Sequence, residues 1–463
     1  MRRRQFALGA AYAAAGTSLM GLAACGGGDS AVPAPAPSPV PTPVPSSAVQ
    51  IHLPADHYLH RGAPTEWWWH IGTLKAGSRT FGFEINAASF AKDGFAFTQI
   101  MLADIANNKH YQRTTPYIPP FMFDPDNWAQ NDVNKDWSVR LGDPANKLSA
   151  LELTHPGSGY TSAPTVVITG GGGALASGIA VHDPATGKIA SVVLFGAGLG
   201  YTSLPTVTLV GGGGTGATAK ALFTYVTMDA PWADPSKNML VKAALVDEAT
   251  GILVDFDLKL SQNGPPFIVW GTGVNGGSSS FDTNAATHLK NNNYYYSLTR
   301  LQTSGSVTIN GEKLDVSGVT WMDHEYGAFG TAINPVKWVL QDMQLDNGVC
   351  ISNYATYTSG APVLNQKAKS EATVQRADGT TYLVESFLTP TGRTWTSGVS
   401  GTTYNMQFQI DIPAFNASLV VTSLMDSQEF PVLTKPTYEG VAGATGTFEG
   451  KKVTGTAWNE QSV

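Results

Sequence analysis

The side chains best suited to chemistry are concentrated in two short stretches of this sequence. The first, residues 56–74, holds His57, His60, Glu66 and a run of three tryptophans that begins at residue 67. A carboxyl group is rarely buried without a partner, so Glu66 must find a donor, keep water or stay protonated. Because aromatic faces can stabilise a cation, this stretch indicates acid–base chemistry beside a cation-stabilising wall.

The second stretch is Thr-Trp-Met-Asp-His-Glu-Tyr-Gly, residues 320–327. Its carboxylate and imidazole could trade protons as general acid and base. On a strand, Asp323 and Glu325 point to one face while His324 and Tyr326 point to the other. The same alternation separates Glu66, Trp68 and His70 from Trp67, Trp69 and Ile71. The alternative is a strand end whose polar residues only meet solvent.

Other classes of site have weaker support. The four histidines between residues 52 and 70 have no spacing that fixes a tetrahedral site, so we expect no metal and no cofactor. The sequence contains no Gly-x-Ser-x-Gly nucleophile elbow, which argues against a classical serine hydrolase. Cys350 lies in a strand-like run and is expected to be a buried structural thiol.

The composition predicts strands as the elements that position these residues. The chain has 463 residues, 42% of them apolar and 14% charged, with 50 glycines, 28 prolines and many short alternating runs. This favours an all-β protein of two or three domains. The net charge of -7 provides no electrostatic footprint for nucleic acid or an anionic membrane surface, so nucleic-acid partners are not expected.

About eight strands are expected in each half of the chain, which indicates two antiparallel barrels or sandwiches. The first half includes a predicted strand at residues 293–301 and a hairpin at residues 305–319 that leads into the second dense stretch. The remaining predicted strands cover residues 80–90, 95–106, 238–260 (a hairpin), 337–344, 349–357, 372–376, 382–389, 404–412, 418–424 and 452–459.

An internal repeat interrupts the first half. The octapeptide Gly-Tyr-Thr-Ser-Ala-Pro-Thr-Val begins at Gly159 and recurs, with Leu for Ala, from Gly200, and the tetraglycine runs at 170–173 and 211–214 keep the same offset. Neither run is followed by the Lys-Ser or Lys-Thr of a phosphate loop, so a duplicated β-repeat is the better interpretation. We treat residues 155–223 as an insertion that could bind a surface partner or a glycan.

The N-terminus has the pattern of an export signal. Three arginines precede an apolar run that ends in Leu-Ala-Ala-Cys, so residues 1–24 are a predicted signal peptide and Cys25 a predicted lipidation site. Residues 25–50 form a proline-rich linker, with seven prolines between residues 33 and 45. We expect an exported lipoprotein on the periplasmic face of a bacterial membrane, with the outer membrane favoured and the lipid as its only membrane contact. The alternative is an ordinary signal peptide with a chance cysteine.

Five motifs together resemble the AttH-like, carotenoid 1,2-hydratase type family of secreted bacterial proteins. They are Asp56-His57-x-x-His60, Glu66-Trp67-Trp68, Trp321-Met322-Asp323-His324-x-Tyr326-Gly327, Tyr438-Glu439-Gly440 and Val453-Thr454-Gly455. The chain departs from the family pattern at three places: Trp69 replaces a usual tyrosine, Tyr326 replaces a usual tryptophan, and the motif at residue 438 lacks a tryptophan. These departures leave the substrate open.

The resemblance implies two tandem lipocalin-like β-barrels, with the small β-repeat insertion in the first. The N-terminal domain would cover residues 51–330 and the C-terminal domain residues 331–463, with an apolar pocket near their junction. By the same resemblance we assign Asp323, His324, Tyr326 and Glu66 as catalytic residues. The residues assigned to substrate binding are Trp67, Trp68, His60, Trp321 and Trp338.

The leading hypothesis is a cofactor-independent hydratase, isomerase or cyclase that acts on a hydrophobic, unsaturated small molecule of isoprenoid or polyketide type. In it, Asp323 or Glu66 is the acid, His324 its partner, and Trp67, Trp68 and Tyr326 stabilise a cation. The alternative is a non-catalytic carrier of a lipid or pigment, because a barrel of this size can simply hold a ligand. The sequence also leaves open whether Glu66 acts on substrate or only anchors the second motif, and we favour the anchor.

Overall fold

The computed structural model describes residues 40–117, 128–141, 148, 150–201, 204–247, 249–274, 281–329, 337–357, 366–432 and 435–462. The predicted signal peptide and the predicted lipidation site at Cys25 lie outside these residues, as do the first residues of the linker. No helix in the described ranges is long and apolar enough to cross a membrane.

The first large sheet is antiparallel and carries both dense stretches. Its strands run in the order β4-β3-β2-β1-β17-β16-β14-β13-β12-β5, and the two-residue strand β15 pairs with β16. Their bounds are β1 (Thr65–Ala76), β2 (Arg79–Phe90), β3 (Phe95–Asp104), β4 (Lys109–Tyr117), β5 (Trp137–Leu141), β12 (Tyr225–Ala230), β13 (Met239–Val246), β14 (Leu253–Gln262), β15 (Phe267–Ile268), β16 (Asn293–Ile309) and β17 (Glu312–Gly327).

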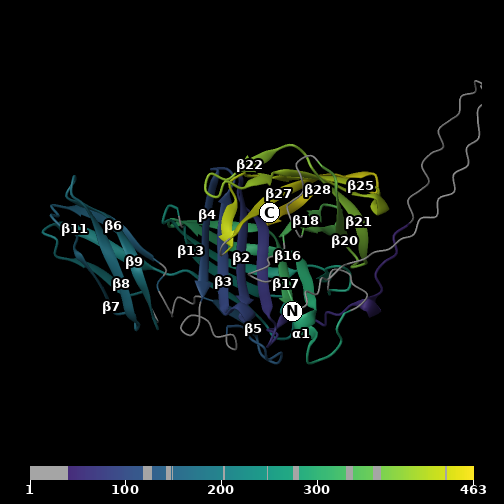
Figure 1. Cartoon of the computed structure of the whole chain (residues 1–463), viewed down its shortest axis with the longest axis horizontal. Coiled ribbons are helices and arrows are strands. Elements are labelled where there is room, and N and C mark those ends of the chain that lie inside the picture. Colours follow the sequence, from purple (N-terminus) through teal and green to yellow (C-terminus); the bar gives the residue numbers. More distant parts are fainter. Residues whose placement is uncertain are drawn as a thin grey trace, which may run out of the picture. The chain divides into compact units, whose positions relative to one another are not determined.

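This sheet is curled around a single apolar core rather than closed by pairing of its two edge strands in the described residues. The strands β12 and β13 approach β2, β3 and β4 across that core (Figure 1). The core side chains include Trp68, Phe83, Phe256 and Met322, which are all at most 2% exposed. The helix α1 (His288–Asn291) and the 3-10 turn η2 (Ala55–His57) are short elements beside this curled sheet.

The centre of the curled sheet is the pairing of β1 with β17. The predicted strand at residues 293–301 and the predicted hairpin are continuous here, because β16 and β17 are 17 and 16 residues long. A register shift between Leu298 and Leu301 lets β16 follow the curl without ending. The two dense stretches therefore lie side by side on adjacent strands.

The second large sheet closes into an eight-stranded barrel. Its strands run β25-β24-β21-β20-β19-β18-β28-β27-β26. The strand β25 also pairs with β27, which closes a ring of eight strands and leaves β26 outside it. Their bounds are β18 (Lys337–Leu345), β19 (Cys350–Tyr357), β20 (Ala368–Gln375), β21 (Thr381–Pro390), β24 (Gln407–Ile412), β25 (Ala417–Ser423), β26 (Glu429–Val432), β27 (Lys435–Phe448) and β28 (Lys451–Ser462), with a small ribbon of β22 (Thr394–Thr396) and β23 (Thr403–Asn405). The predicted all-β fold of two tandem lipocalin-like β-barrels is confirmed, with the second barrel closed and the first a curled half-barrel, and Cys350 is buried as expected. The predicted domain boundary at residue 330 falls outside the described residues.

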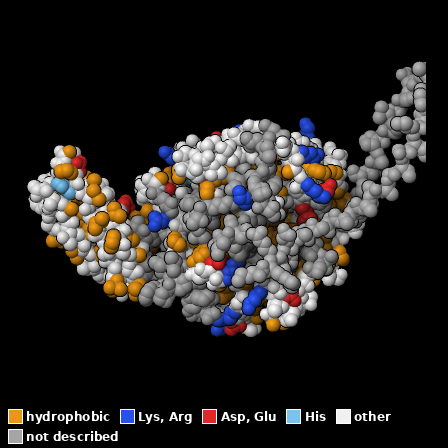
Figure 2. Space-filling view, viewed as in Figure 1, with side chains coloured by type: hydrophobic (Ala, Val, Ile, Leu, Met, Phe, Trp, Pro, Cys, Tyr) orange, Lys and Arg blue, Asp and Glu red, His pale blue; other side chains and the backbone are white. Residues whose placement is uncertain are grey.

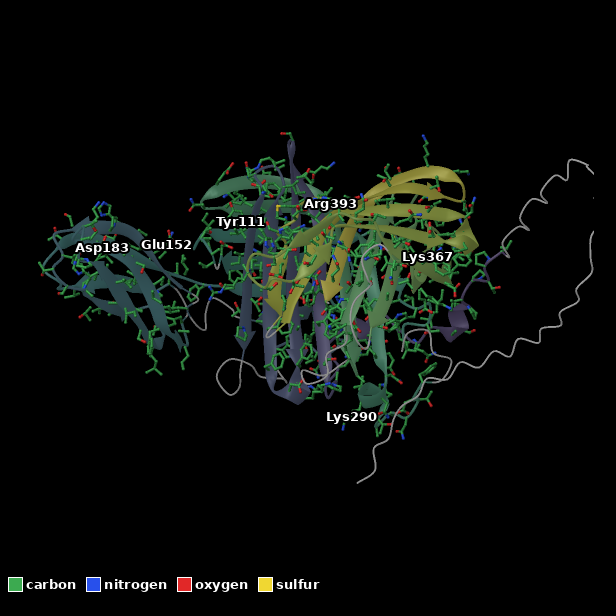
Figure 3. The ribbon with its side chains drawn as sticks, turned by 45° about the horizontal axis from the view of Figure 1, so that its top comes forward. Tyr111, Glu152, Asp183, Lys290, Lys367 and Arg393 are labelled. Atoms are coloured by element: carbon green, nitrogen blue, oxygen red, sulfur yellow. The ribbon has the colours of Figure 1, made fainter. Side chains whose placement is uncertain are left out.

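The repeat forms its own small sheets, which carry the labels Glu152 and Asp183 in Figure 3. The strands are β6 (Ala150–Ser158), β7 (Thr165–Thr169), β8 (Ala174–Asp183), β9 (Lys188–Leu199), β10 (Thr206–Val210) and β11 (Thr215–Leu222). Hydrophobic side chains are exposed over its surface (Figure 2), among them Leu175 at 78% and Phe195 at 83%.

The tetraglycine runs have a packing role in this insertion. A Cβ atom on Gly214 would lie 2.5 Å from Tyr160, and one on Gly173 would lie 2.5 Å from Tyr201. Each buried repeat tyrosine thus packs on the last glycine of the other repeat's run. This close approach explains the shared offset without a phosphate ligand.

A third apolar cluster joins the curled sheet to the barrel. It contains Ile71 and Trp321 from the first sheet, Trp270 from the turn after β15, and Val441 and Trp458 from the second sheet. The backbone N–H of Trp270 also donates to the Thr373 hydroxyl at 2.9 Å. The face of β1 and β17 that points away from the first core therefore faces the barrel.

Candidate functional site

The register of β1 and β17 sorts the functional side chains onto two faces. Glu66 pairs with Tyr326, and Trp68 pairs with His324, on the face that points into the curled sheet. We call this the inner face. Alternating with these pairs, the register joins Trp67 with Glu325 and Trp69 with Asp323. These four side chains point towards the barrel, on what we call the outer face.

On the inner face Glu66 is the centre of a hydrogen-bonded cluster. Its Oε1 lies 2.8 Å from His60 Nδ1 and 3.1 Å from His324 Nε2. The backbone N–H of His60 donates to Oε2 at 3.0 Å, and Asp56 Oδ1 lies 3.6 Å from His60 Nε2. The burial problem that the sequence poses for Glu66 is thus solved by two imidazoles.

Aromatic rings hold the two imidazoles in place. The His60 ring stacks on Tyr326 with a centroid distance of 3.6 Å, and the His324 ring stacks on Trp68 at 4.4 Å. The Tyr296 hydroxyl lies 2.5 Å from His57 Nδ1 and 3.4 Å from His324 Nδ1. These contacts leave little freedom of rotation to either histidine.

The charges of the inner cluster balance one another. Burial opposes ionisation of Glu66, but His60 and His324 hold the pKa of its carboxyl below the ordinary value. Burial likewise opposes the cation on His60, but Glu66 and Asp56 raise its pKa to about 9. Glu66 is therefore an ionised acceptor at neutral pH and carries no proton to donate.

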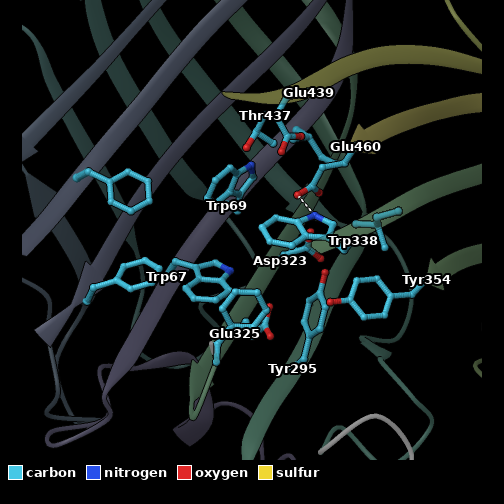
Figure 4. A pocket seen from close by; sticks show the side chains of 15 residues that line it. Trp67, Trp69, Tyr295, Asp323, Glu325, Trp338, Tyr354, Thr437, Glu439 and Glu460 are labelled. Carbon is cyan, nitrogen blue, oxygen red and sulfur yellow. Dashed lines mark hydrogen bonds between the residues drawn. The ribbon is translucent and has the colours of Figure 1, made fainter. Parts of the chain in front are cut away.

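The outer face lines a cavity of about 100 Å³ between the curled sheet and the barrel (Figure 4). Most of its wall is aromatic or aliphatic, and four of its residues are carboxylic acids. The lining consists of Trp67, Trp69, Ile71, Phe90, Phe97, Tyr295, Asp323, Glu325, Phe329, Trp338, Leu340, Tyr354, Thr437, Glu439 and Glu460. No Lys, Arg or His is found among the described residues that line it.

Tryptophan N–H groups orient three of these carboxyls. The indole of Trp338 donates to Glu460 Oε1 at 2.5 Å, as Figure 4 shows. Trp458 Nε1 donates to Glu439 Oε2 at 2.8 Å, and Trp321 Nε1 donates to Asp323 Oδ1 at 2.7 Å. One oxygen of each acid is thereby fixed.

Burial without a nearby cation raises the pKa of all four acids. It raises the pKa of Asp323 to about 6 and that of Glu460 to about 7. It also raises the pKa of Glu325 and Glu439 well above the usual range, and Glu460 adds to the effect on Glu439. At neutral pH, Glu325, Glu439 and part of the Glu460 population can therefore donate a proton, whereas Asp323 is mostly ionised.

The structure divides the predicted site residues between the two faces. Asp323, Trp67 and Trp338 line the cavity, whereas Trp321 supports Asp323 from its side. The other predicted residues, Glu66, His60, Trp68, His324 and Tyr326, belong to the inner cluster. Of the two predicted partners of His324, Glu66 is in contact with it, whereas Asp323 is not, because adjacent residues of a strand point to opposite faces.

Several cavity residues were not assigned from the sequence. Trp69, Tyr295 and Glu325 are neighbours of assigned residues, and face alternation could have added them. Glu439 lies in the quoted Tyr-Glu-Gly motif. Glu460 had no local signal, because its role depends on the pairing of β28 with β18.

Comparisons with known proteins agree with this fold. The model of the AttH-like family matches residues 208–460. An AttH protein from Nitrosomonas europaea has 19% identity and a TM-score of 0.54, with 91% of this chain and 100% of that chain covered. Kievitone hydratase from Nectria haematococca has 14% identity and a TM-score of 0.52, with 92% and 96% covered.

No curated protein sequence matches the chain. At these identities the solved structures establish the architecture, while the family model covers more than half of the sequence. The predicted resemblance is thereby confirmed. The chain belongs to the AttH-like family.

Proposed function

We propose that the protein is a hydratase- or cyclase-type enzyme that protonates a carbon–carbon double bond of a hydrophobic small molecule in the cavity between the two sheets. Glu460 is the acid in this proposal, with Glu439 and Asp323 beside it. The observation that carries it is a set of buried carboxyls with raised pKa in an aromatic cavity whose described lining contains no cationic side chain. The family's fold, shared with kievitone hydratase, supports the reaction class.

The proposed step begins with transfer of the Glu460 proton to one alkene carbon, which leaves a cation on the other. The ring faces of Trp67, Trp69 and Tyr295 line the space where this charge develops. In hydration, water attacks the cation and returns one proton to the Glu460 carboxylate. In cyclisation, a second double bond of the substrate attacks instead, and a neighbouring C–H loses its proton to the carboxylate.

The inner cluster has a supporting role in this proposal. Glu66, His324 and Tyr326 do not line the cavity, and the ionised Glu66 lacks a proton to donate. We assign them to holding β1 against β17, so that Trp67 and Trp69 face Asp323 and Glu325 across the outer face. The volume of about 100 Å³ fits the reacting end of a substrate.

The test is incubation of the purified protein with a panel of hydrophobic alkenes of isoprenoid and polyketide type, followed by mass spectrometry. Hydration adds the mass of one water, and cyclisation changes retention time at constant mass. Glu460→Gln should reduce turnover by about 100-fold or more, because the amide cannot donate the proton.

The matched control is Glu371→Gln, which changes a partly buried carboxyl of the barrel outside the cavity. It should keep full turnover. Ligand that is recovered unaltered from every incubation would favour the non-catalytic carrier. Equal turnover in Glu460→Gln and wild type would overturn the assignment of the acid.

We also propose that the protein is exported and lipid-anchored through Cys25, which lies outside the described residues. The motif Leu-Ala-Ala-Cys supports this. Labelling of growing cells with a radioactive fatty acid should mark the wild type, and Cys25→Ser should lose the label. A label that persists in the variant would contradict the anchor.

A further inference from the structure

We propose that His60, Glu66 and His324 form a binding site for a divalent transition-metal ion, with Zn²⁺ as the best match. Two imidazoles and one carboxylate are a ligand set that zinc uses in proteins. This inference concerns the inner cluster and stands independently of the chemistry proposed for the cavity. The sequence argued against a metal because the four histidines between residues 52 and 70 have no spacing that fixes a tetrahedral site. The third ligand comes instead from a residue 258 positions after Glu66.

The three ligand atoms converge on one point from three separate segments. Glu66 Oε1 on β1 lies 2.8 Å from His60 Nδ1, which precedes β1, and 3.1 Å from His324 Nε2 on β17. All three atoms lie within 4.8 Å of one another. Zinc–ligand distances of about 2.0–2.2 Å at tetrahedral angles place ligand atoms roughly 3.4 Å apart, so an ion requires these two contacts to open outward by about half an ångström.

The outer atoms of each ligand have the partners that a metal site needs. Asp56 Oδ1 lies 3.6 Å from His60 Nε2, and the Tyr296 hydroxyl lies 3.4 Å from His324 Nδ1. The second oxygen of Glu66 accepts the backbone N–H of His60 at 3.0 Å. Such outer partners orient ligating histidines and are a regular part of zinc sites.

The rings are also prearranged, and the site has an entrance. Tyr326 stacks on His60 and Trp68 stacks on His324, so both imidazoles already have the orientation that binding requires. Glu66 and His324 are 2% and 0% exposed. The side chains of His60 and Asp56 are 16% and 19% exposed, which leaves a path for an ion from solvent.

A bound ion would tie the segment before β1 to the centre of the curled sheet. His60 lies in that segment, whereas Glu66 and His324 belong to strands that pair with each other. Binding free energy at such a cross-link adds to the folding free energy. The expected role of the ion is structural, on the opposite face of β1 from the cavity.

The test uses the full chain without an affinity tag, treated with chelator and then dialysed. Calorimetric titration with Zn²⁺ alone should show one equivalent bound, and the melting temperature should rise with added Zn²⁺. Titration with Co²⁺ alone should produce visible absorption bands. Mg²⁺ should leave both the heat signal and the melting temperature unchanged, because a site of two imidazoles disfavours it.

Variants locate the ion. His60→Gln and Glu66→Gln should abolish stoichiometric Zn²⁺ binding, and Asp56→Asn, which keeps all three ligands, should weaken it about 10-fold. The control His182→Gln changes a half-buried histidine of the insertion and should bind as the wild type does. If a ligand variant fails to fold, Asp56→Asn still decides the question.

Two results would overturn the inference. One is a folded, chelator-treated wild type that gives neither heat with Zn²⁺ nor absorption with Co²⁺. The other is unchanged affinity in His60→Gln and Asp56→Asn, which would place the ion elsewhere. In either case the cluster would be a hydrogen-bonded ion pair only.

Discussion

The inner and outer faces of β1 and β17 place the same residue types in opposite states. Glu66 and Glu325 belong to neighbouring rungs of one strand pair and are 2% and 6% exposed. Burial alone would raise the pKa of both. The pKa of Glu66 is lowered because His60 and His324 contact it. The pKa of Glu325 is raised well above its usual value by burial and by nearby acids, and the hydrogen bond from the Asn293 amide offsets only part of this. The partner, and not the burial, decides the charge.

This difference separates anchoring from chemistry on one pair of strands. An ionised Glu66 between two histidines holds the strands, and protonated acids on the other side provide donors to a cavity. Since side chains alternate, a slip of one residue in the register would exchange the two sets. The long β16–β17 hairpin helps to fix the register that keeps them apart.

The largest expected effect is a difference in unfolding free energy between a variant of the inner face and a variant of the outer face. In chelator-treated protein, Glu66→Leu leaves the His60 cation buried without its main counter-charge and should cost about 3–5 kcal/mol of unfolding free energy. Glu325→Gln should cost less than about 1 kcal/mol, because an amide replaces a carboxyl that is already neutral and still accepts from Asn293. Urea unfolding at pH 7 measures both, and equal losses would contradict the distinction between the faces.

The next effect is a pH dependence from the outer face. Burial raises the pKa of Glu460 from 4.5 to about 7, and the charge of Asp323 adds to the effect. Its protonated form is the one that folding favours, so its contribution to stability is complete below pH 4.5 and is lost as the pH rises through about 7. The loss is on the order of 2–4 kcal/mol, at about 1.4 kcal/mol per pKa unit.

Glu460→Gln should remove that slope. Urea unfolding at pH 4.5 and pH 8 should show that the unfolding free energy of the variant, relative to that of the wild type, is higher at pH 8. A wild type and variant with parallel pH profiles would show that Glu460 ionises freely in the folded protein.

A smaller effect of opposite sign is expected from the inner face. The lowered pKa of Glu66 means that its stabilising contribution is present above pH 4.5 and is lost as the pH falls through the folded pKa. The shift is modest because burial offsets most of the attraction to the histidines. In chelator-treated protein, the stability advantage of wild type over Glu66→Gln should therefore shrink between pH 5 and pH 3; an advantage that grows on acidification would contradict the ionised anchor.

The smallest expected effect tests whether Tyr326 has a structural or a catalytic role. Tyr326→Phe keeps the ring that stacks on His60 at 3.6 Å and should change stability by less than about 1 kcal/mol. Turnover should also change little, because Tyr326 does not line the cavity. A large loss of turnover with unchanged stability would return Tyr326 to the catalytic group that the family motif predicted.

Much of this architecture follows from local patterns in the sequence. Short alternating runs predicted an all-β chain, and two repeated octapeptides predicted the insertion, which begins in β6 at Ala150. Alternation along the two dense stretches correctly separated Asp323 and Glu325 from His324 and Tyr326. These properties depend on the two-residue period of a strand, which any strand of this sequence must obey.

The pairings between distant segments were decided only by the tertiary structure. His324 meets Glu66 because β17 pairs with β1, and Glu460 meets Asp323 in one cavity because the barrel packs on the outer face. The sequence indicated Glu66 and Asp323 as candidate acids, whereas contacts with His60 and His324 make Glu66 an anion. Strand order, barrel closure and the resulting burial set these contacts, and with them the pKa of every acid, because desolvation and charge act through space rather than along the chain.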